Sequence, residues 1–183
     1  MQTPMTPPSP RRDTPADPGL AEVVAYVELQ RLESRYADVV TRRARGELTE
    51  IVRDDCPIVV DVRHTRFELT GPTEYGKFMD GAIQRFSLFE FVLLNMVFRV
   101  DAQRGVAAAR VYMQEIRQNV SDGRRTDAYG VYHDRLERSE DGRWRFARRH
   151  YRSFARTAEP RVDADFDVFD LPVIPLEEIL GGS

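Results

Sequence analysis

Four strand-like segments follow one another in the second half of the chain, separated only by short turns. Each is rich in aromatic and β-branched residues, which favour a pleated, half-buried sheet surface. The segments cover residues 89–101, 106–119, 126–138 and 143–154. Because connections of a few residues cannot carry a crossover, consecutive strands of this kind pair antiparallel. The second half of the chain is therefore expected to form one continuous antiparallel sheet.

Helical periodicity and short connections dominate the first half of the chain. Asp17-Pro18 places an N-cap residue before a proline at the first helical position, and Gly46 is a typical residue just beyond a helix end. The expected elements are a helix over 18–45, a short helix over 48–52, two short strands over 58–62 and 66–69, and a third helix that begins at Gly71. Helices that precede a run of strands predict the α+β class.

Composition divides the chain into three parts. Residues 1–17 hold five prolines among polar residues and are expected to be a disordered tail. Residues 18–156 have the length of one domain that can bury a core. Residues 157–183 form an acidic extension whose apolar side chains need cover. We expect this extension to pack on the open end of the domain or on a partner subunit, with disorder as the alternative.

Charge and cysteine content exclude several classes of protein. The net charge of −3 gives no indication of nucleic-acid binding. The single cysteine, Cys56, excludes an intramolecular disulfide and favours a reducing compartment. The sequence contains no apolar run long enough to span a membrane and no signal-peptide core at its start, so a cytoplasmic protein is expected.

Three stretches resemble the SnoaL-like proteins of the NTF2-like superfamily. They are RYADVV at 35–40, the helix after Gly71-Pro72, and the final hairpin GVYHDRLERSEDGRWRFARRHYRSF at 130–154. The resemblance covers about residues 20–156. It implies a cone in which three N-terminal helices pack in a curved, mostly antiparallel sheet with one open end. Members of this group include polyketide cyclases and lyases related to scytalone dehydratase and to dehydrochlorinases.

Arg149 and Tyr132 are the candidate catalytic residues. In the relatives, the arginine that follows Trp-x-Phe-x-x points into the cavity, and Arg149 matches it. Such an arginine would bind a carboxylate, phenolate or enolate oxygen, or stabilise negative charge in a transition state. The alternative is a structural arginine paired with an acidic residue. Tyr132 shares a strand face with Asp134 and is expected to be a pocket phenol that donates a hydrogen bond or acts as a general acid.

Side-chain alternation and the resemblance add candidate substrate-binding residues. Tyr36 lies on the apolar stripe of the first helix. Alternation along the last strand puts Tyr151 on the same face as Arg149 and Phe146 on the opposite face. Asn95 interrupts an apolar strand face, so a buried amide is expected that contacts a ligand or clamps the structure. Tyr112 and Gln114 would line a polar pocket wall or form a dimer face. The binding candidates are Tyr36, Asn95, Tyr112, Gln114 and Tyr151.

The catalytic dyad of the lyase relatives does not appear in this sequence. Those enzymes use an Asp late in the first helix to hold a His on the first long strand. Thr41 occupies the Asp position, and residues 86–90 contain no histidine. Glu90 or Asp38 could serve as an alternative base. The three scattered histidines do not form a metal-binding pattern, so no metal and no cofactor are expected.

Two functions fit these observations. The first is a cofactor-independent enzyme of secondary metabolism, a cyclase, dehydratase or isomerase (a lyase or isomerase in reaction type) acting on a hydrophobic oxygenated molecule such as a polyketide or terpenoid intermediate. The second is a non-catalytic ligand-binding or dimerisation protein. A carboxylate or histidine inside the cavity would favour the enzyme. The expected partners are a small hydrophobic molecule and a second copy of the chain, paired through the sheet, with no nucleic acid and no membrane.

Overall fold

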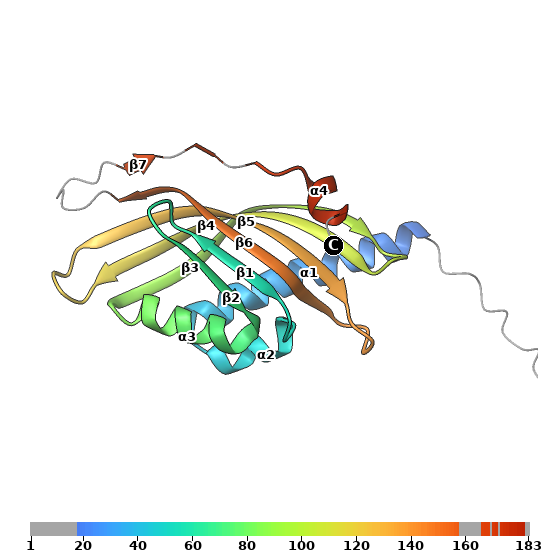
Figure 1. Cartoon of the computed structure of the whole chain (residues 1–183), viewed down its shortest axis with the longest axis horizontal. Helices are drawn as coiled ribbons and strands as arrows, with labels where there is room; N and C mark the ends of the chain where they lie inside the picture. Colours follow the sequence, from blue (N-terminus) through green and yellow to red (C-terminus); the bar gives the residue numbers. More distant parts are fainter. Residues whose placement is uncertain (1–17, 158–165, 169, 172, 182–183) are drawn as a thin grey trace, which may run out of the picture.

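The computed structural model describes residues 18–157, 166–168, 170–171 and 173–181. The expected disordered tail, 1–17, lies outside the described residues. The described part has an α+β architecture in which helices lie against one face of a curved sheet (Figure 1).

Three helices and one 3-10 turn form the layer against the inner face of the sheet. They are α1 (Pro18–Thr41), η1 (Arg45–Glu47), α2 (Leu48–Ile51) and α3 (Gly71–Ile83). Helix α1 ends at Thr41, four residues earlier than expected, because Arg43 adopts the left-handed conformation with φ of 59°. A residue in this conformation commonly closes a helix. The α3 start at Gly71 is confirmed, and only glycine fits there, because a Cβ would lie 2.4 Å from the Asp54 carbonyl oxygen.

Six strands form a continuous sheet in the order β2-β1-β6-β5-β4-β3, and a short seventh strand adds to β6. The strands are β1 (Pro57–Asp61), β2 (Arg66–Thr70), β3 (Phe86–Asp101), β4 (Val106–Asn119), β5 (Arg125–Arg138), β6 (Trp144–Thr157) and β7 (Phe166–Val168). Strands β3 to β6 form the expected antiparallel meander. The hairpin of β1 and β2 joins the sheet by parallel pairing of β1 with β6. The predicted α+β class and antiparallel meander are confirmed.

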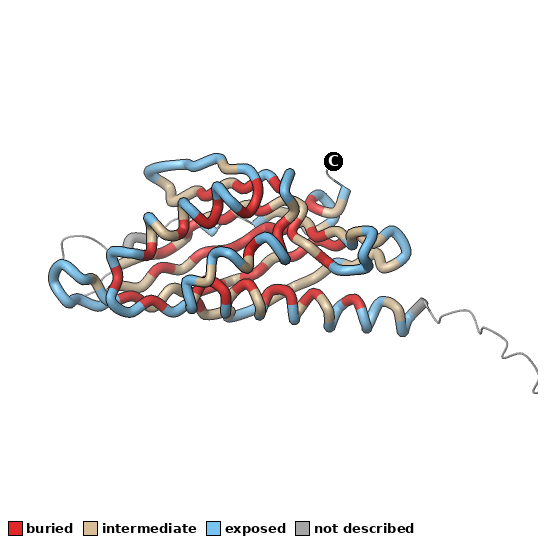
Figure 2. Tube along the Cα trace, turned by 90° about the horizontal axis from the view of Figure 1, so that it is seen from below, coloured by how far each residue is buried: buried red, intermediate tan, exposed pale blue. Residues whose placement is uncertain are grey.

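The core lies between α1 and the inner face of the sheet. Buried positions recur along α1 at helical spacing (Figure 2). Their side chains belong to one hydrophobic core together with buried residues of the strands. In α1 these side chains belong to Ala25, Leu29, Leu32, Tyr36, Val39 and Val40. This packing leaves one end of the cone, formed by α3, the start of β3 and the ends of β4 and β6, as the place where a cavity can open.

The described part of the C-terminal extension, residues 166–168, 170–171 and 173–181, runs over the outer face of the sheet (Figure 1). Helix α4 (Leu176–Gly181) packs against β4, with Ile179 only 2 % exposed. The backbone N–H of Ile174 donates a hydrogen bond to Nε2 of His133 at 3.2 Å, and Arg135 donates to the Leu180 carbonyl. The described part of the extension therefore packs on the protein's own sheet, and its expected contact with a partner subunit stays a prediction. None of the helices in the described ranges is both long and apolar enough to cross a membrane.

Candidate functional site

A cavity of about 120 Å³ lies inside the cone, between α1, α3 and the inner face of the sheet. We call it the inner cavity. Most of its wall is apolar or aromatic, and eight of the lining residues carry a polar group. The apolar and aromatic lining residues include Val40, Val60, Met79, Ile83, Phe86, Phe89 and Phe91; the polar ones are Tyr36, Tyr75, Tyr132, Tyr151, Glu115, Arg85, Arg117 and Arg156. An apolar pocket with a small number of polar groups is the usual form of a small-molecule site.

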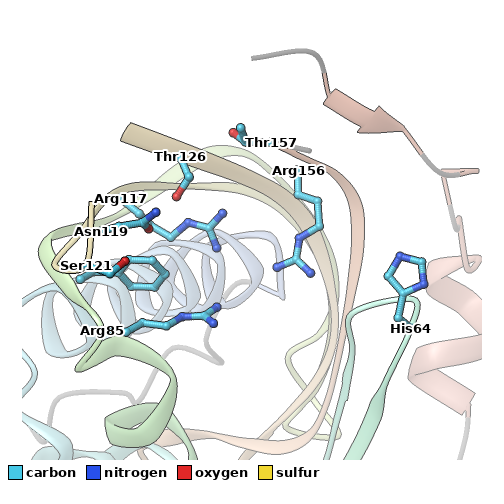
Figure 3. Close-up of a pocket in the computed structure, with 9 residues that line it drawn as sticks. His64, Arg85, Arg117, Asn119, Ser121, Thr126, Arg156 and Thr157 are labelled. Carbon is cyan, nitrogen blue, oxygen red and sulfur yellow. The ribbon is translucent and has the colours of Figure 1, made fainter. Parts of the chain in front are cut away.

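A second space of about 430 Å³, the mouth pocket, adjoins the inner cavity at the open end of the cone. Arg85, Phe86, Arg117 and Arg156 line both spaces, so the two lie side by side. Unlike the inner cavity, the mouth pocket is mainly polar. Figure 3 shows its residues, which come from the start of β3 and the residue before it, from β4, β5, β6 and the β4–β5 turn, with His64 on the loop between β1 and β2. A polar mouth therefore lies next to a mainly apolar interior.

Three tyrosines from different elements meet at the inner cavity. The Tyr36 hydroxyl on α1 is hydrogen-bonded to Tyr75 of α3 and, at 3.2 Å, to Tyr132 of β5. Burial raises the pKa of each of these phenols, so all three stay neutral and keep a hydroxyl proton to donate. Because a hydroxyl can rotate, one of the three can turn its proton toward a ligand oxygen. The structure thus brings together Tyr36 and Tyr132, both predicted from the sequence, and adds Tyr75.

Arg149 lies behind this tyrosine cluster rather than in the inner cavity. Its side chain is fully buried and forms a two-pronged ion pair with Asp134 of β5, with N–O distances of 3.1 and 2.8 Å. The guanidinium carbon lies 3.9 Å from the ring centre of Tyr36 and 4.3 Å from that of Tyr132. This geometry is a cation–π contact. Arg149 can therefore influence a ligand only through the tyrosine rings, and its pairing with an acid matches the structural alternative considered from the sequence.

Glu33 of α1 completes the buried group around Arg149. Its carboxylate lies 3.9 Å from the Arg149 guanidinium, and the side chain is wholly buried. Burial, together with the nearby Asp134 carboxylate, raises the pKa of Glu33 to about 8. Its two oxygens have no hydrogen-bond partner among the described residues. At neutral pH the group therefore holds one cation, one anion and one protonated carboxyl, which avoids a net charge in the core.

A β-bulge explains why simple alternation mis-assigned the faces of β6. The pairing of β5 with β6 shifts register between Arg135 and Leu136, which leaves Ala147 as an extra residue. The alternation restarts after the bulge, so Phe146 and Arg149 are both buried on the inner face. Alternation without the bulge predicted opposite faces for these two residues, and that prediction was wrong.

Tyr151 lines the inner cavity, and Gly130 makes its position possible. Tyr151 faces inward two residues after Arg149 and contacts the Tyr132 ring at a centroid distance of 5.0 Å. A Cβ at Gly130 would lie only 2.1 Å from a ring carbon of Tyr151. The tyrosine ring therefore rests against the bare backbone of β5, in a space that any larger residue would fill.

Glu115 and Arg117 of β4 are the polar cavity residues that the sequence reasoning missed. Met113 faces inward on β4, and Glu115 and Arg117 follow it at steps of two residues. Simple alternation along the strand therefore predicts that both charged side chains face inward. The Glu115 side chain is 23 % exposed and that of Arg117 6 %, and their charged groups lie 3.4 Å apart. Burial raises the pKa of Glu115, and the neighbouring arginines oppose this shift. A carboxyl group thus faces the same cavity as the tyrosine cluster.

Three of the predicted binding residues lie on the outer face of the sheet. Tyr112 and Gln114 alternate with the inward-facing residues of β4 and therefore point away from the cavity. Tyr112 packs on Phe154, and Gln114 donates a hydrogen bond to Asp127. Asn95 is exposed, because the β3–β4 register shifts between Leu93 and Asn95 and turns the amide outward opposite Tyr112. The expectation that Asn95 is a buried amide was wrong, again because of a β-bulge.

The other residues considered from the sequence have structural partners or lie on the surface. Asp38 pairs with Arg42 on the surface of α1 at 2.8 Å. Glu90 is exposed on the outer face of β3. The Thr41 hydroxyl, at the position of the relatives' Asp, accepts the backbone N–H of Phe91. His133 is buried under the C-terminal extension, away from the cavity. Within the described residues, no cluster of three or more His, Cys, Asp or Glu side chains could hold a metal ion.

Comparisons with known proteins agree with this fold. A candidate scytalone dehydratase from Novosphingobium aromaticivorans is 20 % identical over 86 % of this chain and 99 % of its own, with a TM-score of 0.68. The hexachlorocyclohexane dehydrochlorinase LinA-type3 from Novosphingobium barchaimii is 19 % identical over 85 % of this chain and 99 % of its own, with a TM-score of 0.67. At these identities the likeness shows the fold alone.

The search of curated proteins gives no match. The sequence profile of the SnoaL-like domain, in contrast, matches residues 21–150, from the first helix to the middle of β6 and therefore well over half of the chain. The chain belongs to the SnoaL-like family, with an NTF2-like fold.

Proposed function

We propose that this protein is a cofactor-independent enzyme that moves a proton at a carbon next to an oxygen-bearing group of a small hydrophobic molecule. One observation carries the proposal: the inner cavity holds both the Glu115 carboxyl group and the cluster of Tyr36, Tyr75 and Tyr132. From the sequence, we expected a carboxylate or histidine in the cavity to favour an enzyme over a binding protein. Glu115 is that feature.

Glu115 would act as the general base. A carboxylate in a partly dry cavity is a stronger base than one in water, because burial disfavours its charged form. In the first step the C–H bond next to a carbonyl breaks, and its proton passes to a Glu115 oxygen. The electron pair forms a carbon–carbon double bond while the carbonyl π electrons move to oxygen, which gives an enolate. Where the carbonyl is conjugated with a carbon–carbon double bond, the product of this step is a dienolate, and returning the proton to its far carbon completes an isomerisation.

The same enolate can expel a hydroxyl group as water, once that group is protonated, or attack a second carbonyl in the same molecule. The three reaction types considered from the sequence, isomerase, dehydratase and cyclase, therefore share this first step. Polyketide and terpenoid intermediates carry the required carbonyl and hydroxyl groups on an apolar body. The fold neighbours named as a scytalone dehydratase and a dehydrochlorinase support a lyase-type reaction in this cavity.

The tyrosine cluster would stabilise the enolate oxygen. Tyr132 is the best placed donor because it lines the inner cavity and its hydroxyl is held by Tyr36. Arg149 acts as a positioning residue: its guanidinium stacks on the rings of Tyr36 and Tyr132 and keeps a positive charge behind them. Charge placed in advance beside a developing anion costs no reorganisation during the reaction. Tyr151 forms part of the wall against which the apolar body of the substrate packs.

Assembly as a homodimer through the sheet is part of the proposal. The extension leading into α4 covers the outer face of β4. A partner subunit would therefore pack on the strand surfaces that the extension leaves free. Nothing in the proposed chemistry requires the second subunit.

Hydrogen–deuterium exchange of phenylacetone tests the proposed reaction. Its methylene group lies between a phenyl ring and a carbonyl, and proton NMR in D₂O follows loss of the methylene signal. We expect the wild type to accelerate exchange, and Glu115→Gln to slow it by roughly 10²–10⁴-fold. Glu90→Gln is the matched control, because Glu90 is an exposed carboxylate on the neighbouring strand. Equal rates for the wild type and both variants would leave only the ligand-binding alternative.

A further inference from the structure

Three arginines meet at the mouth of the cone with little negative charge to balance them. Arg85 follows α3, Arg117 lies on β4 and Arg156 on β6, and all three line the mouth pocket. Figure 3 shows their guanidinium groups extending toward the same space from different walls. Within the described residues, these three arginines form a single ion pair, which joins Arg117 to Glu115. The mouth therefore has an excess of positive charge.

Arg117 is the most unusual of the three because it is almost completely buried. Its side chain is 6 % exposed, and its Nε atom has no hydrogen-bond partner among the described residues. The pKa of Arg117 is lowered by burial, and the positive charges of Arg156 and Arg85 add to that shift. A buried guanidinium with an unused donor is costly unless an acceptor binds to it.

Hydroxyl groups complete the polar wall. The Thr126 Oγ1 atom on β5 is buried and also has no partner in the described part of the chain. It lines the mouth pocket together with Arg117. Two buried donors without partners thus come from neighbouring strands and face one space, which is the arrangement expected around a bound anion.

We infer that the mouth of the cone is an oxyanion site, which holds the carboxylate or phosphate group of a ligand whose apolar part enters the inner cavity. Guanidinium groups match the geometry of carboxylate and phosphate oxygens and bind them by paired, charge-assisted hydrogen bonds. The inner cavity is close in size to the cavities of roughly 150 Å³ that hold benzene, so a single ring or short chain fits it. The position of the apolar part rests on the proposed function; the oxyanion contact with Arg85, Arg117 and Arg156 does not require catalysis.

Calorimetric titration with matched ligands tests the inference. The probes are 3-phenylpropionate, phenyl phosphate and the neutral alcohol 3-phenylpropanol. We expect at least one of the two anions to bind the wild type more tightly than the alcohol, with an affinity that falls as salt is added. The relative affinities of carboxylate and phosphate then identify which oxyanion the mouth prefers.

Arginine variants test whether the anions bind at the mouth pocket. Arg156→Gln removes a half-buried guanidinium and should weaken binding of the preferred anion by roughly tenfold or more, with no change for 3-phenylpropanol. Arg117→Gln should have the same effect, and Arg117→Lys should restore part of it. Arg31→Gln is the control, because Arg31 is exposed on α1 and its replacement removes the same charge. This variant should bind all three probes with the affinities of the wild type.

The inference fails if the anions and the alcohol bind equally, if no anion binds at all, or if Arg156→Gln behaves like Arg31→Gln. Its failure is distinguishable from failure of the proposed reaction, because phenylacetone is neutral and does not need the arginines. Loss of anion binding in the arginine variants, combined with equal exchange rates for the wild type and Glu115→Gln, would keep the oxyanion site and reject the enzyme.

Discussion

At the scale of single residues, the buried group of Glu33, Asp134 and Arg149 is the least expected part of the core. Arg149 was predicted from the sequence as a cavity residue, and no pattern in the sequence indicated that Glu33 would meet it from α1. A helix periodicity argument places Glu33 beside the apolar stripe, but it does not say that a cation lies opposite. Pairing across a core depends on tertiary contacts, which local patterns do not encode.

Glu33 gives a prediction about stability and pH. Its pKa is about 8 in the folded protein and near 4.5 in the unfolded chain, so the folded state binds the proton more tightly. The stabilising contribution is fully present below pH 4.5 and is lost as the pH rises through about 8. We expect the free energy of unfolding of the wild type to fall across this window relative to Glu33→Gln, by on the order of 3–5 kcal/mol at most.

Urea denaturation at several pH values measures this difference. Glu33→Gln keeps the size and the uncharged state of the protonated carboxyl, so the variant should match the wild type near pH 5 and exceed its stability above pH 8. Titrating groups far from Glu33 cancel in the comparison, whereas Asp134, whose charge helps to raise the pKa of Glu33, contributes to the difference. Parallel pH profiles for the two proteins would show that Glu33 is not protonated in the folded state.

The buried arginine also limits how its role can be tested. Replacing Arg149 by alanine leaves the Asp134 carboxylate buried without a partner, which typically costs 3–5 kcal/mol. A loss of activity in that variant would therefore report misfolding as readily as chemistry.

At the scale of elements, the sequence predicted the strands well and their faces less well. The meander, the early hairpin and the start of α3 are confirmed. The faces of Asn95 and of Phe146 relative to Arg149 were wrong, because each strand contains a bulge that inverts the alternation beyond it. Bulges depend on how two strands pair, so a single strand's pattern does not reveal them. Where β4 follows regular alternation, the same reasoning extends correctly to Glu115 and Arg117.

Gly130 in β5 gives a prediction at this scale. Gly130→Ala places a methyl group on the ring of Tyr151, so we expect a loss of roughly 1–3 kcal/mol in the free energy of unfolding. The displaced ring should also obstruct the inner cavity and weaken binding of 3-phenylpropanol. Gly81→Ala is the control, since nothing lies within 4 Å of its added Cβ and alanine favours a helix by roughly 0.5–1 kcal/mol. Equal stability of the two variants would contradict the described packing of Tyr151.

At the scale of the whole molecule, the cone has two different faces. The inner face carries the tyrosine cluster, Glu115 and the arginines of the mouth, while the outer face is partly covered by the extension that leads to α4. Family resemblance predicted the cone and its open end. It did not predict the position of the polar groups, because this chain lacks the relatives' Asp–His dyad and places a carboxyl on β4 instead.

The position of a bound substrate-like molecule tests the central claim most directly. We suggest a crystal structure with phenylpyruvate, which combines a phenyl ring, an exchangeable methylene, a carbonyl and a carboxylate. The account predicts the ring in the inner cavity, the methylene carbon beside Glu115, the carbonyl oxygen at the Tyr132 hydroxyl and the carboxylate on Arg117 and Arg156. A molecule bound outside the cone, or one whose methylene lies away from Glu115, would contradict it.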